Sequence, residues 1–166
     1  MDYKIGDRVL YPMHGAGVIE AIEEQEVLGE RHAYYIMKLS AGDMKVMIPM
    51  RNAVEIGVRD IITTAQAEVV LQSFAEKRGE EDSNWNKRYR ENMLKIRSGD
   101  IYEVLDVVKS LMCRERRKGL STGERKMLSS AKQILVSELV LANAADIDRI
   151  EILLSDAVDI ELGAVR

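Results

Sequence analysis

The spacing of hydrophobic residues changes once along this 166-residue chain, close to Gly57. Before that point, short runs of β-branched and aromatic residues alternate with glycine and proline, which is typical of antiparallel strands joined by tight turns. After it, apolar residues recur every three to four positions over long stretches, which predicts amphipathic helices. We therefore expect an α+β protein in which residues 1–58 are β-rich and residues 59–166 are helical.

The first part contains four or five short β-prone runs separated by turns. The runs cover residues 8–11, 18–23, 32–39 and 44–48, and a last extended piece covers residues 54–56. Leu28-Gly29-Glu30 is typical of a hairpin turn, whereas Pro12 and Pro49 end the runs that precede them. So few short strands cannot form a sandwich, and a small SH3- or Tudor-like β-barrel is the expected closure.

The second part is predicted to form five helices joined by short loops, which makes a compact all-α domain. The helices cover residues 65–77, 84–97, 100–118, 121–142 and 146–158. Ser83 and Asn84 are residue types that cap helix N-termini, and Glu124 stands three residues after Ser121, as in a capping box. Residues 80–82 form a polar, acidic link between the first two helices.

Positive charge is concentrated in the middle of the chain. The whole chain has a formal net charge of −4, yet residues 84–132 contain 13 Lys and Arg against 6 Asp and Glu. Residues 133–166 contain only 2 Lys and Arg against 7 Asp and Glu. This asymmetry is typical of a localised face that binds a polyanion on an otherwise acidic protein, although solvated helices are often basic as well.

Trp85 is the only tryptophan and stands at the start of the basic block. In the first turn of its helix, a large ring can project beyond the helix end, because side chains lean toward the N-terminus. However, Trp85, Tyr89, Met93 and Ile96 share one helical stripe, which is typical of residues packed against a core. The residues alone leave both interpretations open: a buried tryptophan, or an aromatic and basic binding surface.

The sequence contains no arrangement that predicts catalysis, a metal site or a cofactor. His14-Gly15-Ala16-Gly17 lacks the third glycine and the following helix of a dinucleotide loop, and is interpreted as a turn. His14 and His32 are the only histidines and do not have the spacing of metal ligands, while the lone Cys113 fits a buried thiol. Because the sequence shows none of these sites, we do not expect an enzyme. Since we find no membrane span or secretory signal, we expect a cytoplasmic protein.

Several short motifs, in order along almost the whole chain, resemble the CarD/CdnL family of bacterial transcription regulators. They are Gly6-Asp7-x-Val9-x-Tyr11-Pro12-x-His14-Gly15, Pro49-x-x-Asn52-Ala53, Gly57-Val58-Arg59-Asp60, Asn84-Trp85-x-x-Arg88-Tyr89 and Gly119-Leu120-Ser121-x-Gly123-Glu124. The resemblance implies that residues 1–58 form a Tudor-like module, shared with the transcription-repair coupling factor, that binds the β subunit of RNA polymerase. It also implies that residues 59–166 bind promoter DNA at the upstream edge of the melted region.

The resemblance also implies roles for individual residues. At the DNA, Trp85 is the expected wedge in the minor groove, beside cations expected at the backbone phosphates: Lys87, Arg88 and Arg90, with Arg125 and Lys126 as weaker candidates. At the polymerase, the expected residues are Gln25, Ile36, Met47 and Pro49. Some family members have arginine where this chain has Gln25 and Met47, so we expect docking through the backbone of an exposed strand edge.

The implied mechanism is stabilisation of the open promoter complex. A factor that contacts polymerase and DNA together only when the bubble is open shifts the melting equilibrium toward the open state. We expect it to act as a monomer without a cofactor. The alternative is a protein interaction module of the transcription machinery that does not contact DNA, in which Trp85 belongs to the core.

Overall fold

The computed structural model describes residues 2–40, 42–78 and 84–163, and it confirms an α+β fold. Its strands are β1 (Arg8–Tyr11), β2 (Gly15–Val27), β3 (Glu30–Leu39), β4 (Lys45–Pro49) and β5 (Arg59–Asp60). They form one antiparallel sheet in the order β4-β3-β2-β1-β5. Among the described strands, β4 and β5 are the edges, so the closure into a barrel stays a prediction. Because β5 lies beyond residue 58, the domain boundary stays a prediction as well.

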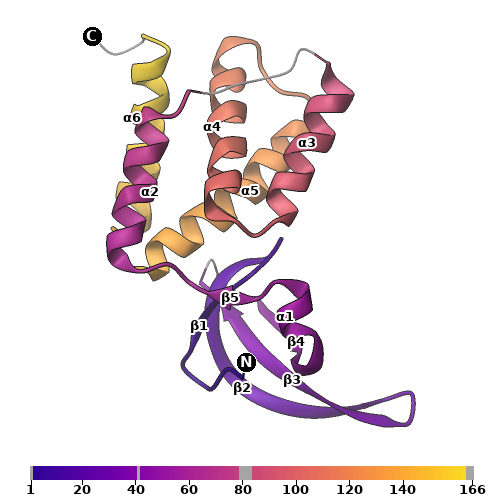
Figure 1. Cartoon of the computed structure of the whole chain (residues 1–166). Coiled ribbons are helices and arrows are strands. Elements are labelled where there is room, and N and C mark those ends of the chain that lie inside the picture. Colours follow the sequence, from indigo (N-terminus) through magenta and orange to yellow (C-terminus); the bar gives the residue numbers. More distant parts are fainter. Residues whose placement is uncertain (1, 41, 79–83, 164–166) are drawn as a thin grey trace.

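The two longest strands, β2 and β3, form a hairpin that extends well beyond the rest of the sheet (Figure 1). Val27 pairs with Glu30, so Leu28 and Gly29 form a two-residue turn, which confirms the predicted hairpin. Both turn residues have positive φ, 52° and 82°, as a type I′ turn requires. Leu28 is 100% exposed, so the tip combines an unfavourable backbone conformation with an apolar side chain in solvent.

The segment predicted to be extended at residues 54–56 is a short helix, so that prediction is wrong. After β4, the 3₁₀-helix η1 (Met50–Asn52) continues into α1 (Ala53–Ile56). Gly57, with a φ of 96°, ends α1 and donates its N–H to the carbonyls of Ala53 and Val54. Three residues are too few to reveal a helical period, and a glycine after an apolar run caps a helix as readily as it ends a strand.

The described residues beyond Asp60 contain the helices α2 (Thr64–Glu76), α3 (Trp85–Arg97), α4 (Ile101–Arg117), α5 (Thr122–Leu141) and α6 (Ile147–Glu161). Each begins after a residue whose side chain accepts a backbone N–H: Thr63, Asn84, Asp100, Ser121 and Asp146. The predicted caps Asn84 and Ser121 are therefore confirmed. Ser83 and the acidic link at residues 80–82 lie outside the described residues.

The helices are stacked on one side of the sheet, with α2 beside α6 and α5 reaching down to β2 (Figure 1). The N-termini of α3 and α5 and the C-terminus of α4 lie at the end of the molecule away from the sheet (Figure 1). One apolar core joins the helices and includes Phe74, Val108 and Leu135, while the sheet has a smaller core around Tyr35 and Ile48. None of the helices in the described ranges has both the length and the apolar character that crossing a bilayer requires.

Polar contacts join the sheet to α5. Ser137 Oγ accepts the Ala16 N–H at 3.0 Å, and the Arg59 guanidinium donates to both carboxylate oxygens of Glu138, at 2.6 and 2.8 Å. Glu138 is 1% exposed and also accepts the Ile62 N–H at 3.0 Å. Because a buried carboxylate is costly unless it is paired, these bonds hold the sheet and the helices in one fixed arrangement.

Candidate nucleic-acid interface

Trp85 is the first residue of α3, at the helix end that lies away from the sheet. Asn84 caps the helix by accepting the Lys87 N–H at 3.0 Å, which fixes Trp85 in the first turn. The tryptophan is 43% exposed, whereas Ile96, three turns later on the same stripe, is 2% exposed. The stripe is therefore a core face at its C-terminal end and an open surface at Trp85, so neither interpretation from the sequence describes the whole stripe.

The indole is held on one face and at one edge. It stacks on Tyr89, with ring centroids 4.9 Å apart and an angle of 18° between the planes. Its Nε1–H donates to Ser121 Oγ at 3.2 Å, across the junction between α3 and the start of α5. Both rings lie close to Gly123, where an added Cβ would stand 3.6 Å from Tyr89 and 3.8 Å from Trp85. The ring is thus oriented by its neighbours while almost half of the residue stays accessible.

Arg88 does not lie with the solvent-facing cations, where the sequence placed it. It is 4% exposed, and its guanidinium donates to Glu124 at 2.8 Å from Nε and 3.2 Å from Nη2. The physical reason is helical spacing, because Arg88 lies three residues after Trp85 and so faces α5, where Glu124 stands in the first turn. Arg88 therefore holds α3 against α5.

Glu124 links this ion pair to the indole. Its backbone N–H donates to Ser121 Oγ at 3.2 Å, the same atom that accepts the Trp85 indole N–H. Burial alone would raise the pKa of Glu124, but the hydrogen bond and charge of Arg88, helped by Arg114, hold that pKa below its ordinary value. A charged Glu124 thus anchors both α3 and the cap of α5, and the position of Trp85 depends on both.

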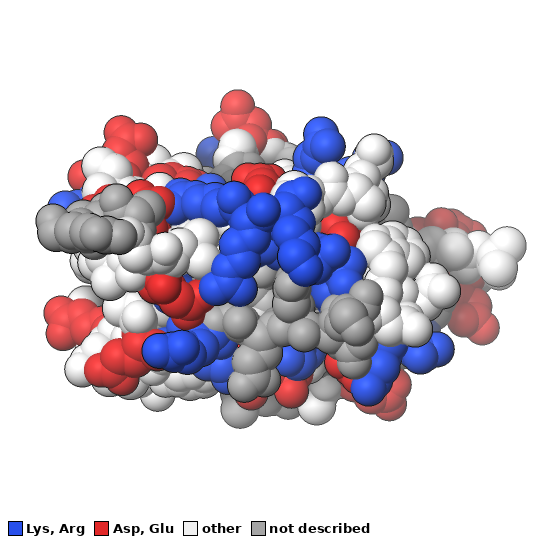
Figure 2. Space-filling model, turned by 90° about the horizontal axis from the view of Figure 1, so that it is seen from above, with Lys and Arg blue, Asp and Glu red and all other residues white. Residues whose placement is uncertain are grey.

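The remaining predicted DNA contacts are exposed. Lys87 and Arg90 lie on α3, and Arg125 and Lys126 lie in the first turns of α5. The Arg125 guanidinium also donates to the Leu120 carbonyl, at 3.2 and 3.3 Å. Seen from this end, the molecule shows Lys and Arg side chains gathered across the helix ends (Figure 2). The indole therefore lies at a basic end of the molecule, where two helix N-termini add positive potential.

From the sequence we predicted Ser121 and Glu124 only as a capping box and did not predict their contacts with α3. Trp85 and Ser121 are 36 residues apart, as are Arg88 and Glu124. The equal separations follow from two helices packed with their N-terminal turns together. A signal existed in the sequence, because Arg88 flanks the apolar stripe and Glu124 is the acidic member of a capping box, but a single sequence does not pair them.

The four residues predicted to contact polymerase share one face of the sheet. Ile36 pairs with Met47 across β3 and β4, and Gln25 Nε2 lies 3.9 Å from Met47 Sδ. Pro49 lies on the same face, two residues from Met47, while the alternate residue Ile48 faces the sheet core. Met47 is 40% exposed on the edge strand β4, but Ile36 is buried at 9%, so Ile36 supports this face from within.

In residues 2–40, 42–78 and 84–163, the side chains of His, Cys, Asp and Glu do not gather in a group of three that could hold a metal ion. Cys113 is buried, and its thiol contacts Glu161 Oε2 at 2.8 Å. His14 lies beside Tyr11, with ring centroids 4.2 Å apart, and His32 contacts Arg51 on the surface of the sheet. The predicted burial of Cys113 is confirmed.

Two family models together match most of the chain. Residues 3–62 match the model described as "CarD-like/TRCF RID domain". Residues 69–155 match the model described as "CarD, C-terminal domain". The first range covers the sheet and the second covers the indole, the Arg88–Glu124 ion pair and most of the helices.

The chain is also similar to a bacterial protein and to a solved domain. A protein of Bacillus subtilis (strain 168) named "Putative transcription factor YdeB" is 39% identical over 137 residues, which cover 82% of this chain and 90% of that protein. The solution NMR structure of the 72-residue N-terminal domain of Myxococcus xanthus CarD is 34% identical in sequence. It covers 36% of this chain and 79% of that chain, with a TM-score of 0.32.

Proposed function

The chain belongs to the CarD family, and we propose on this basis that it regulates transcription by binding RNA polymerase and promoter DNA at the same time. The observation that supports DNA binding most directly is the half-exposed indole of Trp85 at a basic helix end. The relative from Bacillus subtilis is named as a transcription factor, which supports the same general role. The proposed activity is binding alone and includes no catalytic step.

At the DNA, the indole inserts between base pairs at the upstream edge of the bubble. An apolar wedge in the minor groove unstacks a base step at a cost of a few kcal/mol, which is smallest where the duplex is already open. Tyr89 and Ser121 support this role because they fix the ring before DNA arrives, which lowers the entropy lost on binding. The wedge therefore favours melted promoters over intact duplex.

Lys87, Arg90, Arg125 and Lys126 are the cations that we assign to backbone phosphates. All four are exposed, and they belong to the two helices that meet at the indole. Contacts of this kind position a protein without reading base sequence, so the choice of promoter comes from the polymerase that recruits it. Arg88 is left out of this set because its guanidinium is buried against Glu124.

At the polymerase, the outer face and edge of the sheet bind the β subunit. Support comes from the family model over residues 3–62, which describes an RNA polymerase-interacting type of domain. Strand β4 is an edge of the described sheet, and an edge strand can pair with a partner strand through its backbone. Met47 and Gln25 lie exposed beside that edge and would contact the partner directly.

The two contacts together stabilise the open complex. The protein can contact polymerase and promoter DNA at the same time only when the bubble is open, so it binds the open complex more tightly than the closed one. Its binding therefore shifts the melting equilibrium toward the open state. The alternative, an interaction module without DNA contact, is supported by the part of Trp85 that Tyr89 covers. The two functions predict different effects of removing the indole on the lifetime of an open complex.

The test compares Trp85→Ala with Leu94→Ala, which removes a 60% exposed side chain from the same helix. We expect Trp85→Ala to shorten the lifetime of a reconstituted open complex at least tenfold, while Leu94→Ala leaves it unchanged. Because Trp85 is half exposed, its loss should cost about 1–2 kcal/mol of stability, less than the 3–5 kcal/mol of a fully buried aromatic residue. An unchanged lifetime with Trp85→Ala would support the interaction module.

A further inference from the structure

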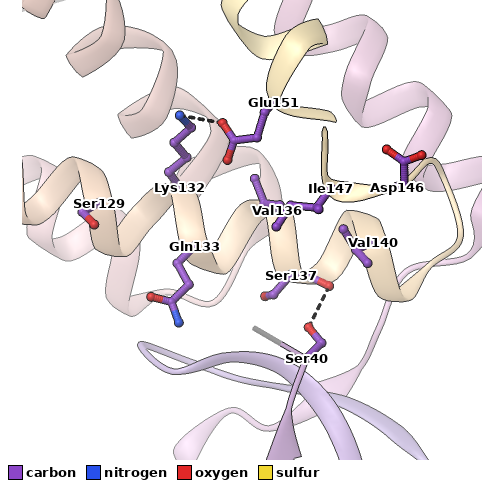
Figure 3. A pocket seen from close by; sticks show the side chains of 10 residues that line it. All are labelled: Ser40, Ser129, Lys132, Gln133, Val136, Ser137, Val140, Asp146, Ile147 and Glu151. Carbon is purple, nitrogen blue, oxygen red and sulfur yellow. Dashed lines mark hydrogen bonds and ion pairs between the residues drawn. The ribbon is translucent and has the colours of Figure 1, made fainter. Parts of the chain in front are cut away.

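A groove runs along the seam between α5 and α6, nearer to the sheet than the indole is. Its larger hollow, of about 560 Å³, lies between α5, the start of α6 and Ser40, which follows β3 (Figure 3). Its apolar lining residues are Val136, Val140 and Ile147. In Figure 3, Lys132 and Glu151 stand at one end of this hollow and Asp146 at the other.

A second hollow, of about 370 Å³, continues the groove toward α4. Met112, Leu128 and Ile152 are among its lining residues. The two hollows share Lys132 and Glu151, whose ion pair of 2.7 Å stands between them. From Val140 to Leu128 the groove follows α5 for about 18 Å, which is roughly three helical turns.

Each hollow leaves one isoleucine partly in solvent. Ile147 in the first hollow is 53% exposed, and Ile152 in the second is 50% exposed. Both belong to α6, which forms one wall of the groove. A groove with two linked hollows, each beside an exposed isoleucine, is suited to the apolar side chains of another helix.

The wall formed by α6 is acidic near the start of the helix. The sequence of this helix contains five carboxylates, Asp148, Glu151, Asp156, Asp159 and Glu161, against the single cation Arg149. Glu151 is paired with Lys132, Asp159 is paired with Arg116, and Glu161 contacts Cys113, so the charge that matters for an occupant of the first hollow is that of Asp148, next to Ile147 in the sequence. Asp146, which caps the helix, adds another carboxylate at the end of the first hollow. An occupant with positive charge beside its apolar face would complement this wall.

We propose that the groove binds an amphipathic helix of a partner protein that has apolar residues on one face and Lys or Arg on its flanks. The apolar residues enter the hollows on either side of the Lys132–Glu151 ion pair, and the flanking cations face Asp146 and Asp148. A small apolar molecule would fill one hollow and would leave the acidic wall without a role. This binding is separate from the proposed contacts with DNA and with the polymerase β subunit.

The test uses the full chain and a synthetic peptide of about five helical turns, with leucine on one face and lysine on the flanks. A second peptide has glutamate in place of lysine and is otherwise identical. Binding is measured by NMR titration of the methyl groups. We expect saturable binding of the lysine peptide, with shifts at Val136, Val140, Ile147 and Ile152, and no binding of the glutamate peptide.

Ile147→Asp and Ile160→Asp form a matched pair of variants. Both add one negative charge to α6, but Ile147 lines the groove, whereas Ile160 is 64% exposed and does not line either hollow. If the groove binds the peptide, Ile147→Asp weakens binding at least tenfold and Ile160→Asp does not. If the peptide instead binds only through the overall negative charge of the protein, both changes strengthen its binding equally. Amide spectra of the variants establish that each remains folded.

Several results would overturn the proposal. They are equal affinity for both peptides, an equal effect of the two variants, or shifts confined to other surfaces. If the molar mass of the protein rises with its concentration and returns to the monomer value in Ile147→Asp, the groove is assigned to a second copy of this chain. Saturable binding of a small apolar dye without binding of either peptide assigns it to a small molecule.

Discussion

Removing the charge of Glu124 while keeping its shape tests how α3 is held against α5. In Glu124→Gln, the Arg88 guanidinium loses the carboxylate that it contacts at 2.8 and 3.2 Å, yet it remains 4% exposed. Removing one partner of a buried ion pair costs about 3–5 kcal/mol. We expect the free energy of unfolding at pH 7 to fall by that amount, measured by urea denaturation.

A double-mutant cycle separates the pair from its surroundings. Arg88→Met removes the cation, and the double variant Arg88→Met/Glu124→Gln removes both charges of the ion pair while Arg114 stays in place. We expect the double variant to be more stable than Glu124→Gln alone, with a coupling energy of about 1–3 kcal/mol. Trp85 is the only tryptophan, so its fluorescence reports directly on the junction that the pair supports. We expect a red shift in Glu124→Gln as the indole loses its fixed contact with Ser121.

The sign of the pH dependence follows from the lowered pKa of Glu124. A carboxyl group whose pKa is lower in the folded state stabilises the fold above the pKa of the unfolded state. That contribution is lost as pH falls through the folded pKa. The difference in stability between wild type and Glu124→Gln should therefore be largest near neutral pH and shrink in acid. A loss below about 1 kcal/mol at pH 7, or a difference that does not change in acid, would refute the reasoning.

Two further changes test single features of the fold. Leu28→Asn should raise the free energy of unfolding by about 1 kcal/mol, because asparagine tolerates the φ of 52° better than leucine does; an unchanged or lower value in urea denaturation would contradict this strain. Burial, with the hydrogen bond to Glu161, raises the pKa of the Cys113 thiol from 9.0 to about 12. Its contribution to stability is therefore complete below the unfolded pKa and lost as pH rises from about 9 toward 12. Cys113→Ala should make the decline in stability over that range less steep, and equal slopes would contradict it.

The division into strands and helices could be predicted because it depends on local spacing. The Leu28-Gly29 turn and the caps Asn84 and Ser121 follow from the two to four residues around each of them. Residues 54–56 were predicted wrongly because so short a segment shows no period, and its helical state depends on Gly57.

The candidate site could be predicted only in part. The residues singled out Trp85 as a large ring beside cations in the first turn of a helix, but only the family resemblance favoured a wedge over core packing. The burial of Arg88 was missed because it depends on Glu124, which is supplied by a different helix. The outcome for a charged residue on an amphipathic helix is decided by what packs against it, and a single sequence does not contain that information.

Because Arg59, Glu138 and Ser137 fix the sheet against α5, the separation between the outer sheet face and Trp85 is a constant of the molecule. In the proposed function, a protein bound at both ends would act as a rigid spacer. It would fit a promoter best when strand separation begins at one distance from the polymerase, and promoters that melt nearer or farther would gain less from it. Such a spacer would distinguish promoters by their geometry and not by their base sequence.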